Sequence, residues 1–150
     1  MRLRDFLEPS AIRLPLLART RDDALVELLS AFGLGDRASA TVIRQLQRRE
    51  TLGSTGFGGG IAIPHCRTLA VNRLRMGFGL SREGIAWGSM DGNPVHAVFL
   101  IVAPPSELSN QYLQVLGRVA QFVHDPGVPA QLCQVASEAE LLALLDQKAL

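Results

Sequence analysis

The 150-residue sequence lacks an excess of charge of either sign, and it has few cysteines and few aromatic residues. Its 15 Lys and Arg residues against 14 Asp and Glu residues give a formal net charge of +1. This balance offers no basic surface to nucleic acid and no cationic run to an anionic membrane. Two cysteines, Cys66 and Cys133, cannot form a disulfide framework. We therefore expect a globular protein without a nucleic-acid partner.

The sequence also lacks an apolar run long enough to cross a membrane. The longest run, residues 95–102 with one histidine inside it, has the length of a strand, whereas a spanning helix needs about 20 residues. The N-terminus carries several charges and Pro9, and it has no apolar core of the kind that a signal peptide needs. We therefore expect a single domain over residues 1–150, cytoplasmic and without direct membrane insertion.

Local patterns predict strands and helices along the whole chain. Thr20 and Ser137 stand as N-caps before apolar residues at helical spacing, and Pro15 interrupts a short edge strand. The expected order is strand 11–18, a helix from Thr20 to Gly33, helix 39–49, strand 61–63, strand 74–80, turns at 82–84 and 91–94, central strand 95–102, helix 109–123, a short helix after Pro126, and a helix after Ser137. This order favours an α/β fold with helical layers around a mixed sheet.

A glycine-rich segment, residues 53–60, separates the second helix from the next strand. Five glycines in eight residues predict an irregular loop and suggest nucleotide binding. The nucleotide motifs do not fit, because no Gly-Lys-Ser/Thr ending exists and Ile61 replaces the last glycine of a dinucleotide fingerprint. The Gly-x-Ser-x-Gly turn of serine hydrolases is absent too. We expect neither chemistry here.

Histidine and cysteine residues do not have the spacing of a metal site. The candidates are His65, Cys66, His96, His124 and Cys133, and they include no Cys-x-x-Cys or His-x-x-x-His pair. Side chains of neighbouring residues in extended chain point to opposite sides, so His65 does not serve a Cys66 nucleophile. We expect no metal and no other cofactor.

His65 and Arg49 remain as candidates for chemistry. His65 follows Pro64 just beyond the glycine-rich segment, where an imidazole near neutrality suits a covalent intermediate. The alternative is a histidine with a purely structural place in the core. Arg49 falls on the apolar side of its helix with Val42 and Leu46. Its stem either covers apolar surface, or its guanidinium points into a site.

The run from Arg49 to His65, RETLGSTGFGGGIAIPH, resembles the signature of the fructose/mannitol-type (type 2) enzyme IIA domains. These domains belong to the phosphoenolpyruvate-dependent sugar phosphotransferase system (PTS). The Gly-Ser-Thr-Gly form is most similar to the nitrogen-regulatory branch, EIIA-Ntr. Weaker resemblance continues through residues 91–95, 98–100 and 113–120, so that it covers nearly the whole chain.

The resemblance implies a fold and a set of roles. The family fold is a three-layer α/β/α sandwich with a mixed sheet. His65 would be phosphorylated on Nε2 by the phosphocarrier HPr, with Arg49 beside the phosphoryl group and Ser54 and Thr55 around it. A backbone carbonyl is expected to hold Nδ1, because that bond leaves Nε2 free to attack. No metal or cofactor is implied.

One position departs from the family pattern. Many members have a second histidine in a His-Leu-x-x-Leu segment, where this chain has Tyr112. Helical spacing turns Tyr112 inward with Val119 and Val123. Together with this spacing, the resemblance implies that the Tyr112 hydroxyl lies near His65 as a donor to the phosphoryl group. The departure weakens the expectation of onward transfer to a IIB domain, but not that of phosphorylation.

The resulting hypothesis is a phosphoryl-carrier protein that acts mainly as a regulator. The chain contains no fused IIB, IIC or HPr-like segment, which favours regulation of a kinase or a transporter. One alternative is a sugar-specific IIA component that passes its phosphate to a IIB domain during uptake. Another is a non-catalytic interaction module, against which the intact Arg49, loop and His65 argue.

Overall fold

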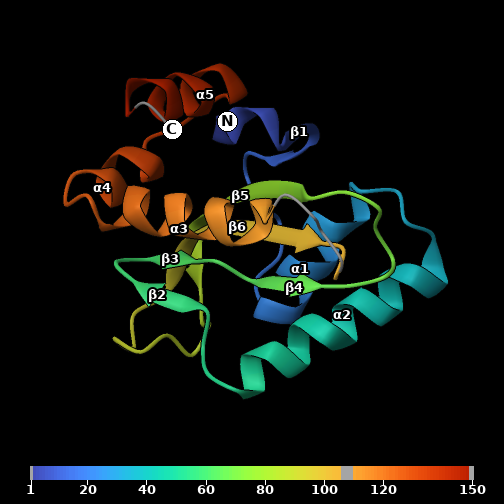
Figure 1. The fold of residues 1–150 in the computed structure, drawn as a ribbon. Coiled ribbons are helices and arrows are strands. Elements are labelled where there is room, and N and C mark those ends of the chain that lie inside the picture. Colours follow the sequence, from blue (N-terminus) through green and yellow to red (C-terminus); the bar gives the residue numbers. More distant parts are fainter. Residues whose placement is uncertain (1, 106–109, 149–150) are drawn as a thin grey trace.

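The computed structural model describes residues 2–105 and 110–148, and it has a mixed sheet between two layers of helices (Figure 1). Helices α3, α4 and α5, orange to red, cover one face, and α1 and α2, blue to cyan, cover the other. This arrangement confirms the predicted three-layer α/β/α sandwich. The elements are a 3-10 helix η1 (Leu3–Asp5), helices α1 (Arg21–Ser30), α2 (Asp36–Thr51), α3 (Gln111–His124), α4 (Val128–Cys133) and α5 (Glu138–Gln147), and strands β1 (Leu7–Arg13), β2 (Gly56–Gly58), β3 (Ile61–Ala62), β4 (His65–Arg67), β5 (Arg75–Ile85) and β6 (Val95–Ala103).

Strand β6 is central, as its apolar sequence predicts. The strand order is β1-β5-β6-β3-β2, and β4 pairs with β6 as well. Phe99 and Ile101 of β6 pack on the side of α3, whereas Val98 and Leu100 pack on the side of α1. Because helices cover both faces, the strand is apolar at every position except His96 rather than alternating.

Strands β3 and β4 pair in parallel with the same edge of β6, β3 near its start and β4 at its end. Between them, the carbonyl of Pro64 accepts a hydrogen bond of 3.0 Å from the N–H of Ile101. The predicted strand at residues 61–63 is therefore confirmed as β3, which ends at Ala62. The sequence did not predict β4, which starts at His65 directly after this break.

The helix starts follow the predicted caps. The hydroxyl of Thr20 accepts a hydrogen bond of 3.1 Å from the N–H of Asp23, and that of Ser137 accepts one of 3.1 Å from Glu140. Both bonds satisfy an N–H group that has no partner within the helix. The short helix after Pro126 is confirmed as α4. Among the described residues, no helix has the length and apolar character to cross a membrane.

Several predicted bounds are wrong. The first strand begins at Leu7 rather than at residue 11, and it ends at Arg13 instead of continuing to residue 18, because Pro15 has no N–H for a strand pairing. Helix α2 begins at Asp36 rather than at residue 39. Strand β5 runs through the predicted turn at 82–84, where a register shift accommodates Gly84 at φ +88°. Helix α3 ends at His124, and its predicted start at residue 109 lies outside the described residues.

The glycine-rich segment is not wholly irregular, contrary to the prediction. Residues 56–58 form β2, which pairs antiparallel with β3. At Gly56 the neighbouring chain comes so close that an added Cβ would lie 2.1 Å from Oγ of Ser89. The glycine at this position therefore permits close packing of the segment against residue 89.

Candidate functional site

His65 lies at the start of β4, where the chain is fixed on both sides. The carbonyl of Pro64 bonds to β6, and His65 itself pairs with Ile101 in the parallel ladder. The strand alternation turns the next residue, Cys66, to the opposite side, where it joins the core beneath α1 and α2. Burial raises the pKa of the Cys66 thiol to about 12, so it stays protonated.

The imidazole of His65 has a defined hydrogen-bonding state. Nδ1 donates to the carbonyl oxygen of Ile63 at 2.7 Å, as expected from the sequence. A carbonyl only accepts, so the proton lies on Nδ1 and the lone pair of the neutral ring lies on Nε2. Burial lowers the pKa of His65, and the Arg49 guanidinium lowers it further, while the Ile63 bond and Glu50 act in the opposite sense. The ring is therefore neutral near pH 7.

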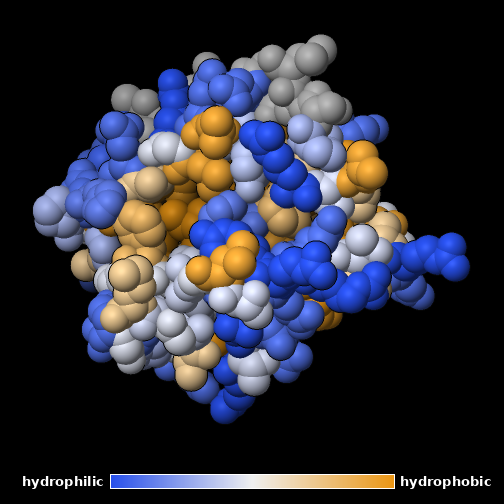
Figure 2. Space-filling model, turned by 60° about the horizontal axis from the view of Figure 1, so that its bottom comes forward, coloured by the Kyte–Doolittle hydropathy of each residue, from blue (hydrophilic) through white to orange (hydrophobic). Residues whose placement is uncertain are grey.

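His65 lines a cavity of about 440 Å³ between the end of α2, the glycine-rich segment and α3. Figure 2 brings forward the lower side of Figure 1, where β2 and α2 lie, and shows apolar side chains around a hollow with hydrophilic ones surrounding it. The structure brings four predicted site residues together in this cavity, and Tyr112 lies beside it. The lining residues are Arg49, Ser54, Thr55, Gly56, Phe57, Ile63, His65, Met90, Leu116, Ala120 and His124.

Arg49 occupies the last turn of α2 and is half-buried. Its Nη1 donates to the carbonyl of Gly53 at 2.8 Å, and its side chain lines the cavity. Of the two possibilities that the sequence left open, this position favours a guanidinium directed into a site. The neighbouring Arg48 is exposed, as predicted.

Sequence reasoning missed Glu50, which organises the wall of the cavity. Its side chain is buried, and it accepts hydrogen bonds from the N–H of Thr55, at 3.1 Å, and from the Thr55 hydroxyl. The indole of Trp87 donates to the same hydroxyl oxygen at 3.4 Å. The sequence does indicate that Glu50 is buried, because it follows Val42 and Leu46 at intervals of four residues and so lies on the same face of the helix.

These bonds distinguish Thr55 from Ser54. The Thr55 hydroxyl gives its proton to Glu50, so it serves the structure of the segment. The Ser54 oxygen accepts from the N–H of Gly56 at 2.9 Å, which leaves its own O–H to donate. Of the two hydroxyls, that of Ser54 is the one that can donate to an anion in the cavity.

Tyr112 lies on the first turn of α3 and faces inward, as predicted. Its ring centroid is 6.2 Å from that of His65, and the guanidinium carbon of Arg67 lies 4.7 Å from the centre of the Tyr112 ring. Burial raises the pKa of the Tyr112 phenol to about 12, so the hydroxyl is neutral at physiological pH.

His124, considered above only as a metal ligand, lines the cavity at the end of α3. Its ring meets Phe57 edge to face, with centroids 4.7 Å apart. Within the ranges 2–105 and 110–148, no three His, Cys, Asp or Glu residues cluster in a way that could hold a metal ion. The polar side chains that line the cavity with His65 are those of Arg49, Ser54, Thr55 and His124.

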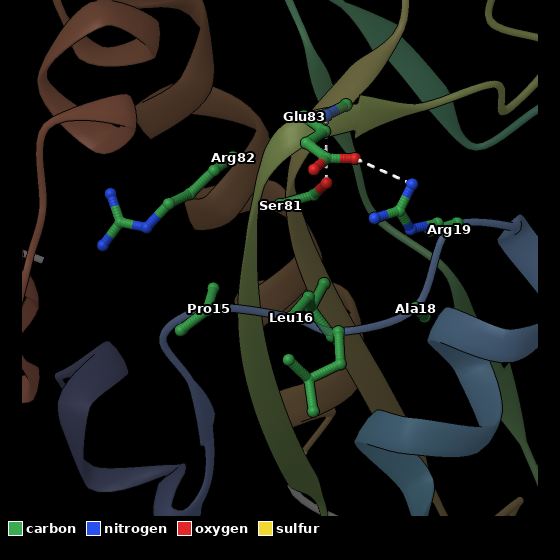
Figure 3. A pocket seen from close by; sticks show the side chains of 9 residues that line it. Pro15, Leu16, Ala18, Arg19, Ser81, Arg82 and Glu83 are labelled. Carbon is green, nitrogen blue, oxygen red and sulfur yellow. Dashed lines mark hydrogen bonds and ion pairs between the residues drawn. The ribbon is translucent and has the colours of Figure 1, made fainter.

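A second cavity, of about 200 Å³, lies between the segment after β1 and the irregular part of β5 (Figure 3). Nη1 of Arg19 and Oε2 of Glu83 form an ion pair there, 3.2 Å apart. None of the described residues that line this cavity is a histidine or a cysteine. It therefore offers no nucleophile comparable to His65.

Comparisons with known proteins show the family to which the chain belongs. The family "Phosphoenolpyruvate-dependent sugar phosphotransferase system, EIIA 2" matches residues 5–148. The fructose-specific EIIABC component of Bacillus subtilis is 30% identical over 98% of the chain, which spans only 23% of that relative. A nitrogen regulatory protein of Bradyrhizobium diazoefficiens is 33% identical, over 88% of this chain and 86% of the relative.

A solved structure is similar over most of both chains. The nitrogen regulatory protein IIA-Ntr of Neisseria meningitidis has a TM-score of 0.83 at 30% identity, and the match covers 94% of this chain and 97% of that one. The relatives thus include nitrogen regulatory proteins and sugar-specific components of the PTS, whose EIIA domains are phosphotransfer components. The chain belongs to the EIIA type 2 family of the phosphoenolpyruvate-dependent sugar phosphotransferase system.

Proposed function

We propose that the protein is a phosphoryl carrier that accepts a phosphoryl group on Nε2 of His65 from an HPr-type phosphocarrier protein. The observation that carries the proposal is the 2.7 Å hydrogen bond from Nδ1 of His65 to the Ile63 carbonyl, in a cavity that also contains Arg49. This bond selects the tautomer whose Nε2 lone pair can attack phosphorus. In this proposal the protein receives the phosphoryl group from the phosphocarrier protein in the cytoplasm.

The transfer needs no group beyond the two proteins. The Nε2 lone pair of His65 forms the new N–P bond while the N–P bond of the donor phosphohistidine breaks, and the donor imidazole leaves with that electron pair. The proton on Nδ1 stays in place. As positive charge develops on the His65 ring, the Ile63 carbonyl stabilises it, because the N–H donor becomes stronger.

Arg49 and Ser54 would stabilise the opposite charge. A phosphoryl group carries close to two negative charges, and its transfer depends mainly on positioning and on charge stabilisation. The guanidinium of Arg49 is a permanent cation held against the Gly53 carbonyl, and Ser54 has an O–H left to donate. Glu50 holds Thr55, and with it this part of the cavity wall.

The carrier acts mainly as a regulator in this proposal, and its phosphorylation state changes its binding to a kinase or a transporter. Tyr112 supports this role, because a phenol has no cationic form and so cannot supply the cation that a second histidine offers for onward transfer. Transfer to a IIB domain during sugar uptake is the second candidate, and the 30% identity with the B. subtilis fructose-specific component favours it. Incubating the labelled protein with an isolated fructose-type IIB domain separates the two, since only the second predicts that the label moves.

Phosphorylation is tested with phosphoenolpyruvate, enzyme I and an HPr-type protein. We expect an acid-labile mass increase of one phosphoryl group, and we expect His65→Ala to abolish it. His96→Ala is the matched control, because His96 lies outside the cavity. A label that persists in His65→Ala, on His96 or on His124, would overturn the proposal.

A further inference from the structure

Arg67 is a second guanidinium close to His65 that the proposed function does not use. Both residues belong to β4 and are two positions apart, so their side chains project to the same side of the strand. Two residues of a strand span about 6.6 Å, which a phosphoryl group on His65 and a long arginine side chain can bridge together. Arg67 is exposed, and it lies outside the lining of the cavity.

Tyr112 connects the two side chains. Its ring lies 6.2 Å from the His65 ring, centroid to centroid, and 4.7 Å from the guanidinium carbon of Arg67. A guanidinium that stacks on an aromatic face keeps its N–H groups in the guanidinium plane available for an anion. Within the part of the chain that the structure describes, no carboxylate forms an ion pair with Arg67.

We propose that Arg67, oriented by the Tyr112 ring, binds the phosphoryl group while that group is on His65 and while it enters or leaves. Arg49 and Arg67 would then hold the group from two sides, one from the end of α2 and one from β4. The inference rests on the proposed phosphorylation of His65. It assigns Tyr112 a further task, which is to hold a cation in place through its ring rather than through its hydroxyl.

A small donor separates contact with the phosphoryl group from docking of a protein. Phosphoramidate carries no protein surface, and in its reaction the donor N–P bond breaks, the Nε2–P bond forms and ammonia leaves. We expect phosphoramidate to phosphorylate Arg67→Gln about threefold to fivefold more slowly than the wild type. The effect is this small because a contact between charges that are accessible to solvent contributes little free energy. The matched control is Arg73→Gln, which removes an exposed arginine outside the site and leaves the rate unchanged.

Two further readouts test the orienting role. The ratio of wild-type to Arg67→Gln rates is expected to be the same from about pH 6 to about pH 8, because a guanidinium stays charged throughout. Tyr112→Phe keeps an aromatic face, so the Arg67 effect persists in that background. Tyr112→Leu removes the face, and adding Arg67→Gln to it is then expected to slow the reaction by less than twofold.

Each outcome decides the inference. Equal rates for wild type and Arg67→Gln with phosphoramidate would overturn it, and so would an effect seen only with a protein donor, which would make Arg67 a docking residue. A full Arg67 effect in the Tyr112→Leu background would overturn the orienting role of the ring. Absence of any phosphoryl group on wild-type His65 with either donor would instead refute the proposed function itself.

Discussion

His65 and His96 have the same backbone hydrogen bond but different surroundings. Nδ1 of His65 lies 2.7 Å from the Ile63 carbonyl, and Nδ1 of His96 lies 2.9 Å from the Ser81 carbonyl. Both rings are half-buried, and both have Nε2 as the remaining nitrogen. His65 lines a cavity with Arg49, whereas His96 lines neither of the two cavities described above.

The ring of His96 is packed against backbone. An added Cβ on Gly84 would lie 3.2 Å from its Nε2, and one on Gly60 would lie 3.6 Å from its Cδ2. A tetrahedral phosphoryl group needs more room than this and a cation beside it. The comparison teaches that a hydrogen bond from Nδ1 to a backbone carbonyl does not by itself distinguish the two histidines, and that His65 differs in lining a cavity together with Arg49.

The largest expected effect comes from removing the buried carboxylate that holds the wall around His65. Glu50→Ala leaves the Thr55 N–H and hydroxyl without their acceptor, and each unsatisfied buried donor costs roughly 1–3 kcal/mol. We expect the free energy of unfolding, measured in urea, to fall by about 3 kcal/mol. Glu50→Gln, which keeps an amide oxygen as acceptor, is expected to lose less.

Glu83→Ala is the matched control, because that carboxylate is exposed and forms only a surface ion pair with Arg19. Its expected cost is below about 1 kcal/mol. Similar losses for Glu50→Ala and Glu83→Ala would mean that the Glu50–Thr55 contact does not support the cavity.

Arg49→Ala removes the guanidinium that lines the cavity together with His65, which is one feature that distinguishes His65 from His96. Loss of a charge-assisted hydrogen bond costs about 1.5–3 kcal/mol, which is roughly a tenfold to hundredfold slower phosphorylation of His65 by the HPr-type donor. Thermal unfolding should change little. Arg48→Ala, on the exposed side of α2, serves as the control, and equal rates for the two variants would contradict the assignment.

Tyr112 lies near His65, with the ring centroids 6.2 Å apart, and we expect its hydroxyl to donate a neutral hydrogen bond to the phosphoryl group. Tyr112→Phe should shorten the lifetime of phospho-His65 modestly, since a neutral hydrogen bond contributes about 0.5–1.5 kcal/mol. Tyr112→His should lengthen it below about pH 6.5, where the added imidazole becomes a cation. The measurement is phosphohistidine decay against pH, and superimposable curves for the three proteins would show that residue 112 does not reach the phosphoryl group.

The smallest expected effect is in the titration of His65 itself. An ordinary histidine, with a pKa of about 6.5, loses about two-thirds of its neutral fraction between pH 7 and pH 6. Burial disfavours the cation and lowers the pKa of His65, so more of this ring stays neutral over that range. NMR titration of the ring proton, assigned with His65→Gln, checks this sign; a midpoint at or above 6.5 would contradict it.

The sequence predicted features that depend on near neighbours. The caps at Thr20 and Ser137 involve bonds to residues three positions away, and His65 and Arg49 stand in one continuous motif. The apolar run of β6 marked the central strand because both its faces are covered. These patterns involve residues close together in the sequence, so they can be recognised without knowing which distant segments the fold brings into contact.

The remaining features depend on contacts between distant segments. Strand β4 exists because residues 65–67 pair with β6, and β5 continues to Ile85 because its irregular end still pairs with β6. The burial of Glu50 follows helical spacing, but its acceptor role requires the bend that brings Thr55 back to α2. The stacking of Arg67 on Tyr112 joins β4 to α3 across the fold.

The contact between Trp87 and Thr55 gives the protein an internal optical probe. The sequence contains one tryptophan, its indole is buried, and its N–H lies 3.4 Å from the hydroxyl oxygen that Glu50 also binds. Intrinsic fluorescence of the unlabelled chain therefore arises largely from a single indole in contact with the cavity wall. Its emission can follow rearrangement of the glycine-rich segment in real time, without a dye, a radioisotope or a partner protein.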